Sequence, residues 1–183
     1  GHPEDVRKGE FEDSMLECVN TMDFRLGETE SWFEKAFSYV QRFIAEGGYR
    51  LYPDMVSLPV SVNGGQDVTI VHRWRNMGWG YCPTNIKAWN QKYKVAFALL
   101  NDNNEVKKIF VDEQSDLSTW LKEAPTTYTT KLSMKGVSVG AYSWAVGLVD
   151  VTKDNEIGLE MAVNQDDNLL NSGWLKLKTI TVN

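Results

Sequence analysis

The stretch NGGQDVTIVHRWR, residues 63–75, decides the fold. The even-numbered side chains from Val68 to Trp74 share one face, which is mostly apolar. A period of two is typical of a strand with one buried face. The Asn63-Gly64 pair at the start of this stretch is a strong hairpin signal. We therefore expect the turn to join a strand at residues 67–75 to an earlier strand at residues 55–62.

The same period continues toward the C-terminus, with turn-forming residues between the segments. Further strands are expected at residues 93–100, 106–111, 128–134, 141–149, 157–163 and 174–182. A bulge near Lys178 is needed in the last of them, because its apolar residues change parity there. Residues 116–123 are expected to form a helical turn around Trp120. The pattern predicts a mainly β fold: an antiparallel β-sandwich of about eight strands, of immunoglobulin-like or jelly-roll type.

The first 48 residues instead show helical spacing. A first helix is expected at residues 10–24 and is followed by a C-cap at Arg25-Leu26-Gly27. A second helix starts at Thr29 and ends at Gly47-Gly48. Apolar residues cover more than half of its circumference, so we expect something large to bury it. An α-helical segment, 1–48, thus precedes the sandwich domain, 49–183.

Composition excludes several classes of function. A net charge of −6 and a pI near 5.0 argue against nucleic-acid binding, which needs a basic surface. No apolar run reaches the ~20 residues of a membrane span. The polar opening, residues 1–13, contains no signal peptide, and we expect the chain to be a piece of a longer protein. Cys18 and Cys82 lack metal-ligand spacing, although a single bridge between them remains open.

Four short motifs carry a resemblance to a known family. They are Asn76-Met77-Gly78-Trp79-Gly80-Tyr81-Cys82-Pro83, Gly140-Ala141-Tyr142, Met161-Ala162-Val163-Asn164 and Gly173-Trp174-Leu175. Residues 49–183 resemble bacterial β-sandwich domains of unknown function that lie C-terminal to glycosidase-like (β/α)₈ barrels. The resemblance implies that residues 1–48 are a helical connector or a remnant of that upstream barrel. It also implies an extracellular, periplasmic or cell-surface location, with the catalytic carboxylates upstream of this chain.

The candidate carbohydrate-binding residues are Trp79, Tyr81 and Trp89. All three lie in a long loop at residues 76–90, and binding residues gather in such loops. Sugar rings stack on exposed aromatic faces. The alternative interpretation is that these rings cap the open end of the sandwich core.

The candidate calcium ligands are Asp150, Asp154 and Glu156, which offer oxygens at alternate places in one acidic turn. Asp and Asn are also the usual residues of hairpin turns, which is the alternative interpretation. Otherwise no cofactor is expected. Glu156 and Glu160 lie about 13 Å apart on a strand, too far for the carboxylate pair of a retaining glycosidase.

The remaining polar residues are expected to be structural. His72 shares its face with apolar residues, which predicts a hydrogen-bonded core histidine. Arg73 and Arg75 lie on the opposite face and are expected to pair with acids, or to bind an anionic sugar.

No complete active site is present in the pattern, so we do not expect this chain to be an enzyme. The sequence predicts a non-catalytic accessory module of a larger carbohydrate-active protein, a glycoside hydrolase. Its partners would be a polysaccharide or oligosaccharide and the upstream catalytic barrel. The alternative is a structural or protein-interaction domain that binds no glycan. A third interpretation is that the chain contributes a loop to the active site of the parent protein.

Overall fold

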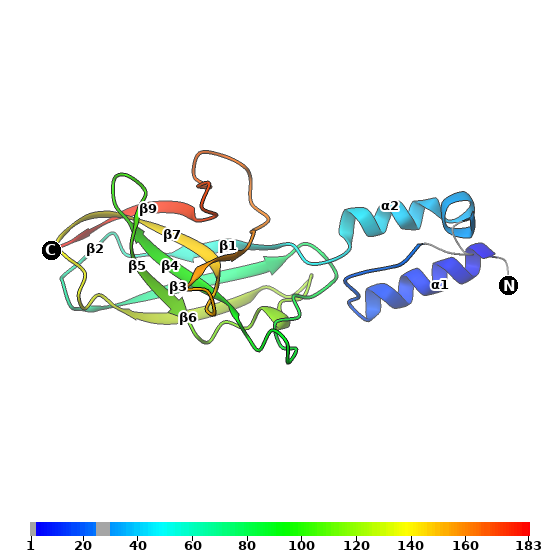
Figure 1. Ribbon diagram of the computed structural model, residues 1–183, viewed down its shortest axis with the longest axis horizontal. Coiled ribbons are helices and arrows are strands. Elements are labelled where there is room, and N and C mark those ends of the chain that lie inside the picture. Colours follow the sequence, from blue (N-terminus) through cyan, green and yellow to red (C-terminus); the bar gives the residue numbers. More distant parts are fainter. Residues whose placement is uncertain (1–2, 25–29) are drawn as a thin grey trace.

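Strand β3 (Asp67–Asn76) alternates between the interior and the solvent, as its sequence predicts. In the computed structural model, which describes residues 3–24 and 30–183, β3 is the middle strand of the smaller of two sheets. The second sheet packs against it, and a pair of helices extends the molecule at one end (Figure 1). The chain is therefore a mainly β sandwich with an N-terminal helical segment.

The two sheets differ in size. The strands are β1 (Leu51–Ser57), β2 (Ser61–Val62), β3, β4 (Tyr93–Leu100), β5 (Val106–Asp112), β6 (Thr126–Ser133), β7 (Gly140–Asp150), β8 (Glu156–Leu159) and β9 (Leu175–Val182). The smaller sheet has the order β1-β3-β6, and the larger has the order β2-β9-β7-β4-β5 with β8 on β7. All pairs are antiparallel except β2 with β9, which is parallel.

The predicted hairpin around Asn63 is wrong. The expected strand at residues 55–62 is two strands, and β1 and β2 belong to different sheets. Between them lies Pro59, which has no N–H to continue a ladder and whose carbonyl instead accepts a 3.0 Å hydrogen bond from Trp144 Nε1. The Asn-Gly turn is present, but it leads from one sheet to the other.

Most other strands follow the prediction. Strands β4 and β5 form the expected hairpin, whereas β8 ends at Leu159, short of the predicted 163. The predicted bulge in β9 is confirmed. Ser143 pairs with Thr179 and Ala145 with Lys176, so two residues of β9 lie opposite Trp144 alone.

Aromatic side chains fill the space between the sheets. Trp74 of β3 stacks on Trp120 with ring centroids 4.9 Å apart, and Trp144 is fully buried. The helical turn predicted at residues 116–123 is the short 3-10 turn η3 (Leu117–Thr119), and Trp120, which follows it, is buried in the core. A second, smaller apolar cluster covers the outer face of the larger sheet, where Trp174 packs. Strand β4 is therefore buried on both faces.

The helices differ from the prediction in their bounds. The first, α1 (Pro3–Leu16), begins and ends earlier than residues 10–24. It ends in a Schellman-type motif, in which Cys18 takes a positive φ of 53° and the Val19 N–H bonds the Ser14 carbonyl. The predicted C-cap at 25–27 lies outside the described residues.

The second helix is interrupted. A π-helical turn, η2 (Ser31–Lys35), is followed by a break at Ala36 and then by α2 (Phe37–Glu46). Gly47 ends α2, as predicted. The two helices and η2 lie together at one end of the molecule (Figure 1), and their apolar side chains form a third cluster with Trp79.

Residues 76–83, which we call the joint loop, hold the helices to the sandwich. The indole of Trp79 packs edge-on against Phe11 and lies 5.5 Å from the Phe43 ring centroid. A Cβ on Gly78 would lie only 2.0 Å from the Gly48 carbonyl oxygen, so glycine is required where the two backbones meet. The first of the four motifs that carry the resemblance therefore forms the connection between the helical segment and the sheets.

The side chain of Asn76 fixes the position of this loop through hydrogen bonds to the backbone. Its side-chain oxygen accepts from the backbone N–H groups of Arg50 and Gly78, and its amide nitrogen donates to the carbonyls of Gly80 and Trp120. Every hydrogen-bonding group of this buried amide is satisfied. It fixes β3, the joint loop and the start of β1 to one another.

Candidate functional site

The three predicted sugar-binding aromatics do not form one platform. Trp79 is 4% exposed, with its ring turned into the helical cluster, so it offers no face for stacking. Trp89 is half-buried and lies perpendicular to Tyr93, with ring centroids 5.3 Å apart. Tyr81 is also half-buried, and its backbone carbonyl accepts a hydrogen bond from Asn20. Trp79 is thus removed from the candidate set, because its partners come from the helices.

Trp89 has a polar neighbourhood of its own. The Lys92 ammonium lies 5.5 Å from the Trp89 ring centroid and 4.8 Å from that of Tyr93. The same ammonium is 3.9 Å from the Asp150 carboxylate. The loop thus ends in an aromatic pair held by a cation, and a part of the Trp89 ring remains accessible.

The calcium candidates are not brought together as ligands. Asp150 is buried and accepts from the Thr152 N–H at 2.9 Å and from its hydroxyl at 2.5 Å. Burial raises the pKa of Asp150, but the Thr152 hydrogen bonds and the charges of nearby lysines outweigh it, and the pKa lies below its usual value. Asp154 and Glu156 are exposed, and Asp154 has the positive φ of a turn residue. Within the described ranges, no group of three or more His, Cys, Asp or Glu side chains could hold a metal ion.

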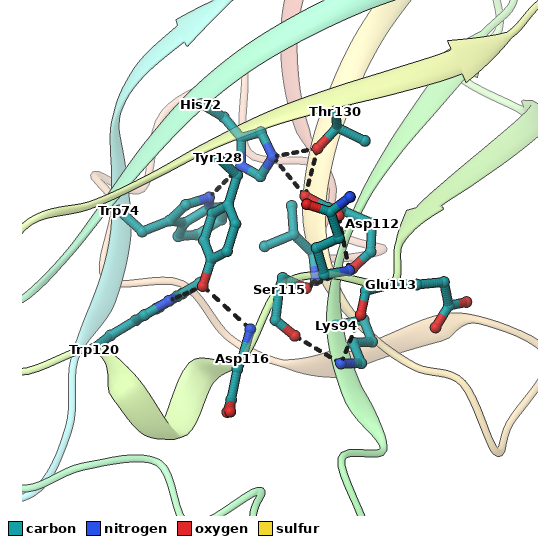
Figure 2. A network of polar contacts seen from close by, with 12 residues as sticks. His72, Trp74, Lys94, Asp112, Glu113, Ser115, Asp116, Trp120, Tyr128 and Thr130 are labelled. Carbon is teal, nitrogen blue, oxygen red and sulfur yellow. Dashed lines mark hydrogen bonds and ion pairs between the residues drawn. The ribbon is translucent and has the colours of Figure 1, made fainter.

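A network of buried polar side chains lies between the two sheets and links β3, β5 and β6 (Figure 2). His72 Nε2 lies 2.9 Å from Asp112 Oδ2, and the Thr130 hydroxyl donates to the same oxygen at 2.5 Å. Trp74 Nε1 donates to His72 Nδ1 at 2.9 Å. Because an indole N–H can only donate, Nδ1 is the acceptor and the imidazole proton resides on Nε2. His72 is therefore a hydrogen-bonded core histidine, as predicted.

Asp112 anchors this network, and the sequence did not single it out. Burial alone would raise the pKa of Asp112, but hydrogen bonds from His72, Thr130 and the Gln114 backbone N–H hold it below its usual value. In the sequence, a carboxylate at the end of a hairpin strand resembles any turn residue. The role of Asp112 is evident only in the fold, where the end of β5 lies opposite His72 of β3 and Thr130 of β6. Since His72 is completely buried and Asp112 is 1% exposed, the network can hold strands together but cannot meet a substrate.

The outer face of β3 carries a different cluster. Strand β1 has a bulge between Pro53 and Met55, and the extra residue is Asp54. Its carboxylate accepts from Arg73 Nε at 2.7 Å and from Arg75 Nε, which confirms the predicted ion pairs. The pKa of Asp54 is lowered, chiefly by the Arg73 hydrogen bond. One carboxylate therefore serves two guanidinium groups.

Arg75 also lines a groove between the end of α2 and the smaller sheet. The groove has a volume of about 520 Å³, and its lining comprises Ala45, Arg50, Tyr52, Arg75, Asn76, Met77 and Lys122. Three of these side chains are cationic and none is acidic. In a chain with a net charge of −6, this groove is the candidate functional site. Sequence reasoning missed it because its residues come from separate segments.

The two cysteines are not bridged. Both are free, and Cys82 is completely buried beside Tyr49. Burial raises the pKa of the Cys82 thiol to about 11 and that of the Tyr49 hydroxyl to about 12. Both groups are thus neutral near pH 7 and belong to the core. None of the helices in the described part of the chain has the length and apolar character that crossing a bilayer requires.

Comparisons with known proteins give weak likenesses. No protein-family model matches the chain, and the search of curated proteins found no match. Among solved structures, the CARDB domain of the PF1109 protein from Pyrococcus furiosus, in complex with di-metal ions, is similar over 74% of this chain and 89% of its own, with 13% identity and a TM-score of 0.39. The C-terminal domain of wzt covers 74% of this chain and 71% of its own, with 10% identity and a TM-score of 0.37.

A Niemann-Pick type C2 protein from the Japanese carpenter ant is also similar, over 74% of this chain and 92% of its own, with 2% identity and a TM-score of 0.34. At these scores the likenesses say nothing about binding or activity.

Proposed function

We propose that this chain is a non-catalytic accessory module of a larger carbohydrate-active protein, a glycoside hydrolase, and that its helical segment docks onto the catalytic barrel. The observation that carries the proposal is a row of exposed apolar side chains, Phe33, Phe37 and Ile44, which we call the outer row. They are 47%, 45% and 68% exposed. The rings of Phe33 and Phe37 contact each other with centroids 5.8 Å apart.

Helix α2 is apolar over a wide arc, of which only a part is covered. Val40 and Phe43 pack in the helical cluster with Trp79 of the joint loop. Phe37 and Ile44, seven positions apart, lie on the uncovered part of this arc, and Phe33 of η2 joins them through its ring contact with Phe37. Each large apolar side chain gains roughly 1.5–3 kcal/mol when it is buried, so an exposed row of this kind favours association. A barrel wall, which the family resemblance implies, is a surface of the right chemistry.

The topology also fits a known accessory architecture. We infer an immunoglobulin-like rather than a jelly-roll sandwich: β1, β3 and β6 correspond to strands A, B and E, and β9, β7, β4 and β5 to strands G, F, C and C′. The split of the first strand into β1 and β2 then places one half in each sheet. This architecture is consistent with an exported module, at the cell surface or in the periplasm, but it carries no function by itself.

Hydrogen exchange tests the docking. We expect amides in residues 31–46 to exchange more slowly in the complete gene product than in the isolated chain. A double variant, Phe33→Ser with Phe37→Ser, should remove that difference, whereas Val139→Ser, which changes another exposed apolar residue, should not. Equal exchange in both proteins, or a gene product that consists of this chain alone, would overturn the proposal.

Carbohydrate binding is the second candidate function, and the Trp89–Tyr93 pair favours it. The perpendicular packing and the Lys92 cation hold the Trp89 ring in one orientation, which reduces the entropy lost on stacking. Titration calorimetry with a panel of polysaccharides should show binding that Trp89→Ala abolishes without unfolding the chain. If no polysaccharide binds, the chain is a structural or protein-interaction domain only.

A further inference from the structure

The groove between α2 and the smaller sheet is lined by positive charge, whereas the chain as a whole has a net charge of −6. Arg50, Arg75 and Lys122 line it, and no carboxylate does. The two acids that pair with this wall are shared: Asp54 serves Arg75 and a second arginine, and Glu46 serves Lys122 at 3.5 Å and also a second arginine. The wall therefore keeps an excess of positive charge.

The two arginines are held in place before any ligand arrives. Arg50 donates to the carbonyls of Ala45 and Ile44 at the C-terminal end of α2, at 2.6 and 3.1 Å. Arg75 donates through Nε to Asp54, which the β1 bulge turns toward it. A guanidinium has five N–H donors, so each arginine retains donors for a planar anion. Preorganisation of this kind lowers the entropic cost of binding.

The remaining lining residues suit a ring. Tyr52 is the cross-strand partner of Arg75 in the β1–β3 register, and both residues line the groove. Met77 is 45% exposed and adds an apolar surface. A groove of about 520 Å³ is in the range of small-ligand sites. Arginine pairs with carboxylates through two parallel hydrogen bonds, and aromatic rings stack on the C–H faces of sugars.

We propose that this groove binds the carboxylate of a uronic acid residue in an acidic saccharide. The inference rests on the carbohydrate context of the proposed function and names the class of glycan. Arg75 and Arg50 bind the carboxylate, Lys122 adds charge, and Tyr52 supports the ring. This places an acidic-glycan site where the helical segment meets the sandwich, and neither Trp89 nor Tyr93 lines it.

The test is a calorimetric titration of the complete chain with tri-galacturonate, with its methyl ester and with inorganic phosphate. We expect saturable binding of the acid, and binding at least tenfold weaker for the ester, which keeps the rings but loses the charge. Arg50→Gln and Arg75→Gln should each weaken binding roughly tenfold or more. The control Lys131→Gln removes an exposed cation that pairs with Asp67 outside the groove, and it should change little. Unfolding curves establish that each variant is folded.

Each of the following outcomes would contradict the proposal that the groove binds a uronic acid. Equal affinity for the acid and the ester would mean that a neutral sugar is bound, which leaves the carbohydrate function standing but not this site. Equal affinity for phosphate would mean a simple anion site. If folded Arg50→Gln and Arg75→Gln variants bind normally, the glycan binds elsewhere. If no saccharide binds at all, the groove proposal fails, while docking of the helical segment stays testable by exchange.

Discussion

His72 and Arg73 are neighbours in the chain, yet they lie on opposite faces of β3, where His72 is buried and Arg73 is partly exposed. On the inner face, His72 has a partner for each ring nitrogen and no exposed surface. On the outer face, Arg73 and Arg75 share the single carboxylate of Asp54, and both are partly exposed.

The difference shows how burial and satisfaction assign roles to polar side chains. A buried network with every donor and acceptor paired stabilises one arrangement of the strands, and it has nothing left with which to recognise a ligand. A half-exposed cluster with more cations than carboxylates contributes little to stability but keeps charge available. Substitutions on the inner face should therefore lower stability, whereas substitutions on the outer face should change stability little and weaken ligand binding.

The largest effect is expected from Asp112→Ala on the inner face. The substitution leaves the buried Thr130 hydroxyl without its acceptor and leaves His72 Nε2 with only its longer, 3.2 Å contact to Thr130 Oγ1, so we expect the free energy of unfolding to fall by about 3 kcal/mol. Urea unfolding monitored by tryptophan fluorescence measures it. The control Asp67→Ala removes an exposed carboxylate from β3 of the smaller sheet and should leave the midpoint nearly unchanged. Equal midpoints for the two variants would show that the buried network does not stabilise the sheets.

The next effect is expected where β3 leads into the joint loop. Gly78→Ala places a Cβ against the Gly48 carbonyl, and one backbone must move, so we expect a loss of about 2 kcal/mol. Gly136→Ala is a comparison without a steric clash. The added Cβ meets no atom there, so any loss of stability comes from the positive φ of this residue alone. Limited proteolysis should release the helical segment from Gly78→Ala faster than from the unmodified chain. Unchanged proteolysis would mean that the close approach at Gly48 is not required.

Sequence reasoning succeeded where a local rule decides the structure. Alternation identified β3 and β7, and the change of parity in the last strand located the β9 bulge correctly. It also predicted His72 as a core residue from its neighbours. These features depend on side chains that lie near one another along the chain.

The failures share a tertiary cause. The alternating pattern continues on both sides of Pro59 and outweighed the one local signal of a break, which is the proline itself. That β1 and β2 join different sheets is evident only in the fold. Trp79 was a candidate for sugar binding because it lies in a loop, with capping of the sandwich core as the alternative, while the helix before it had an apolar face without a partner. The two observations explain each other only in three dimensions, where Trp79 fills the helical cluster. The cationic groove could not be predicted, because Arg50, Arg75 and Lys122 are far apart in sequence.

Acid unfolding should separate the two carboxylates of the comparison. The pKa values of Asp112 and Asp54 are both lowered in the folded state, so each contributes stability that is present above the unfolded value near 4 and is lost as the pH falls through the folded value. Stability should thus decline below about pH 4. Asp112→Asn should flatten that decline at any salt concentration, because burial prevents screening. Asp54→Asn should flatten it only at low salt. Equal salt dependence would contradict the distinction between the faces.

The smallest effect on stability is expected from Arg73→Gln, which alters the outer face beside the groove. Its side chain is 39% exposed, and Asp54 keeps Arg75 as a partner, so the unfolding midpoint should shift less than in any inner-face variant. The released carboxylate then neutralises Arg75 more completely, so the groove loses effective charge. Tri-galacturonate should consequently bind Arg73→Gln more weakly than the unmodified chain, although Arg73 does not line the groove. Unchanged affinity with unchanged stability would mean that Asp54 does not couple the two arginines, and that Arg75 acts on the ligand alone.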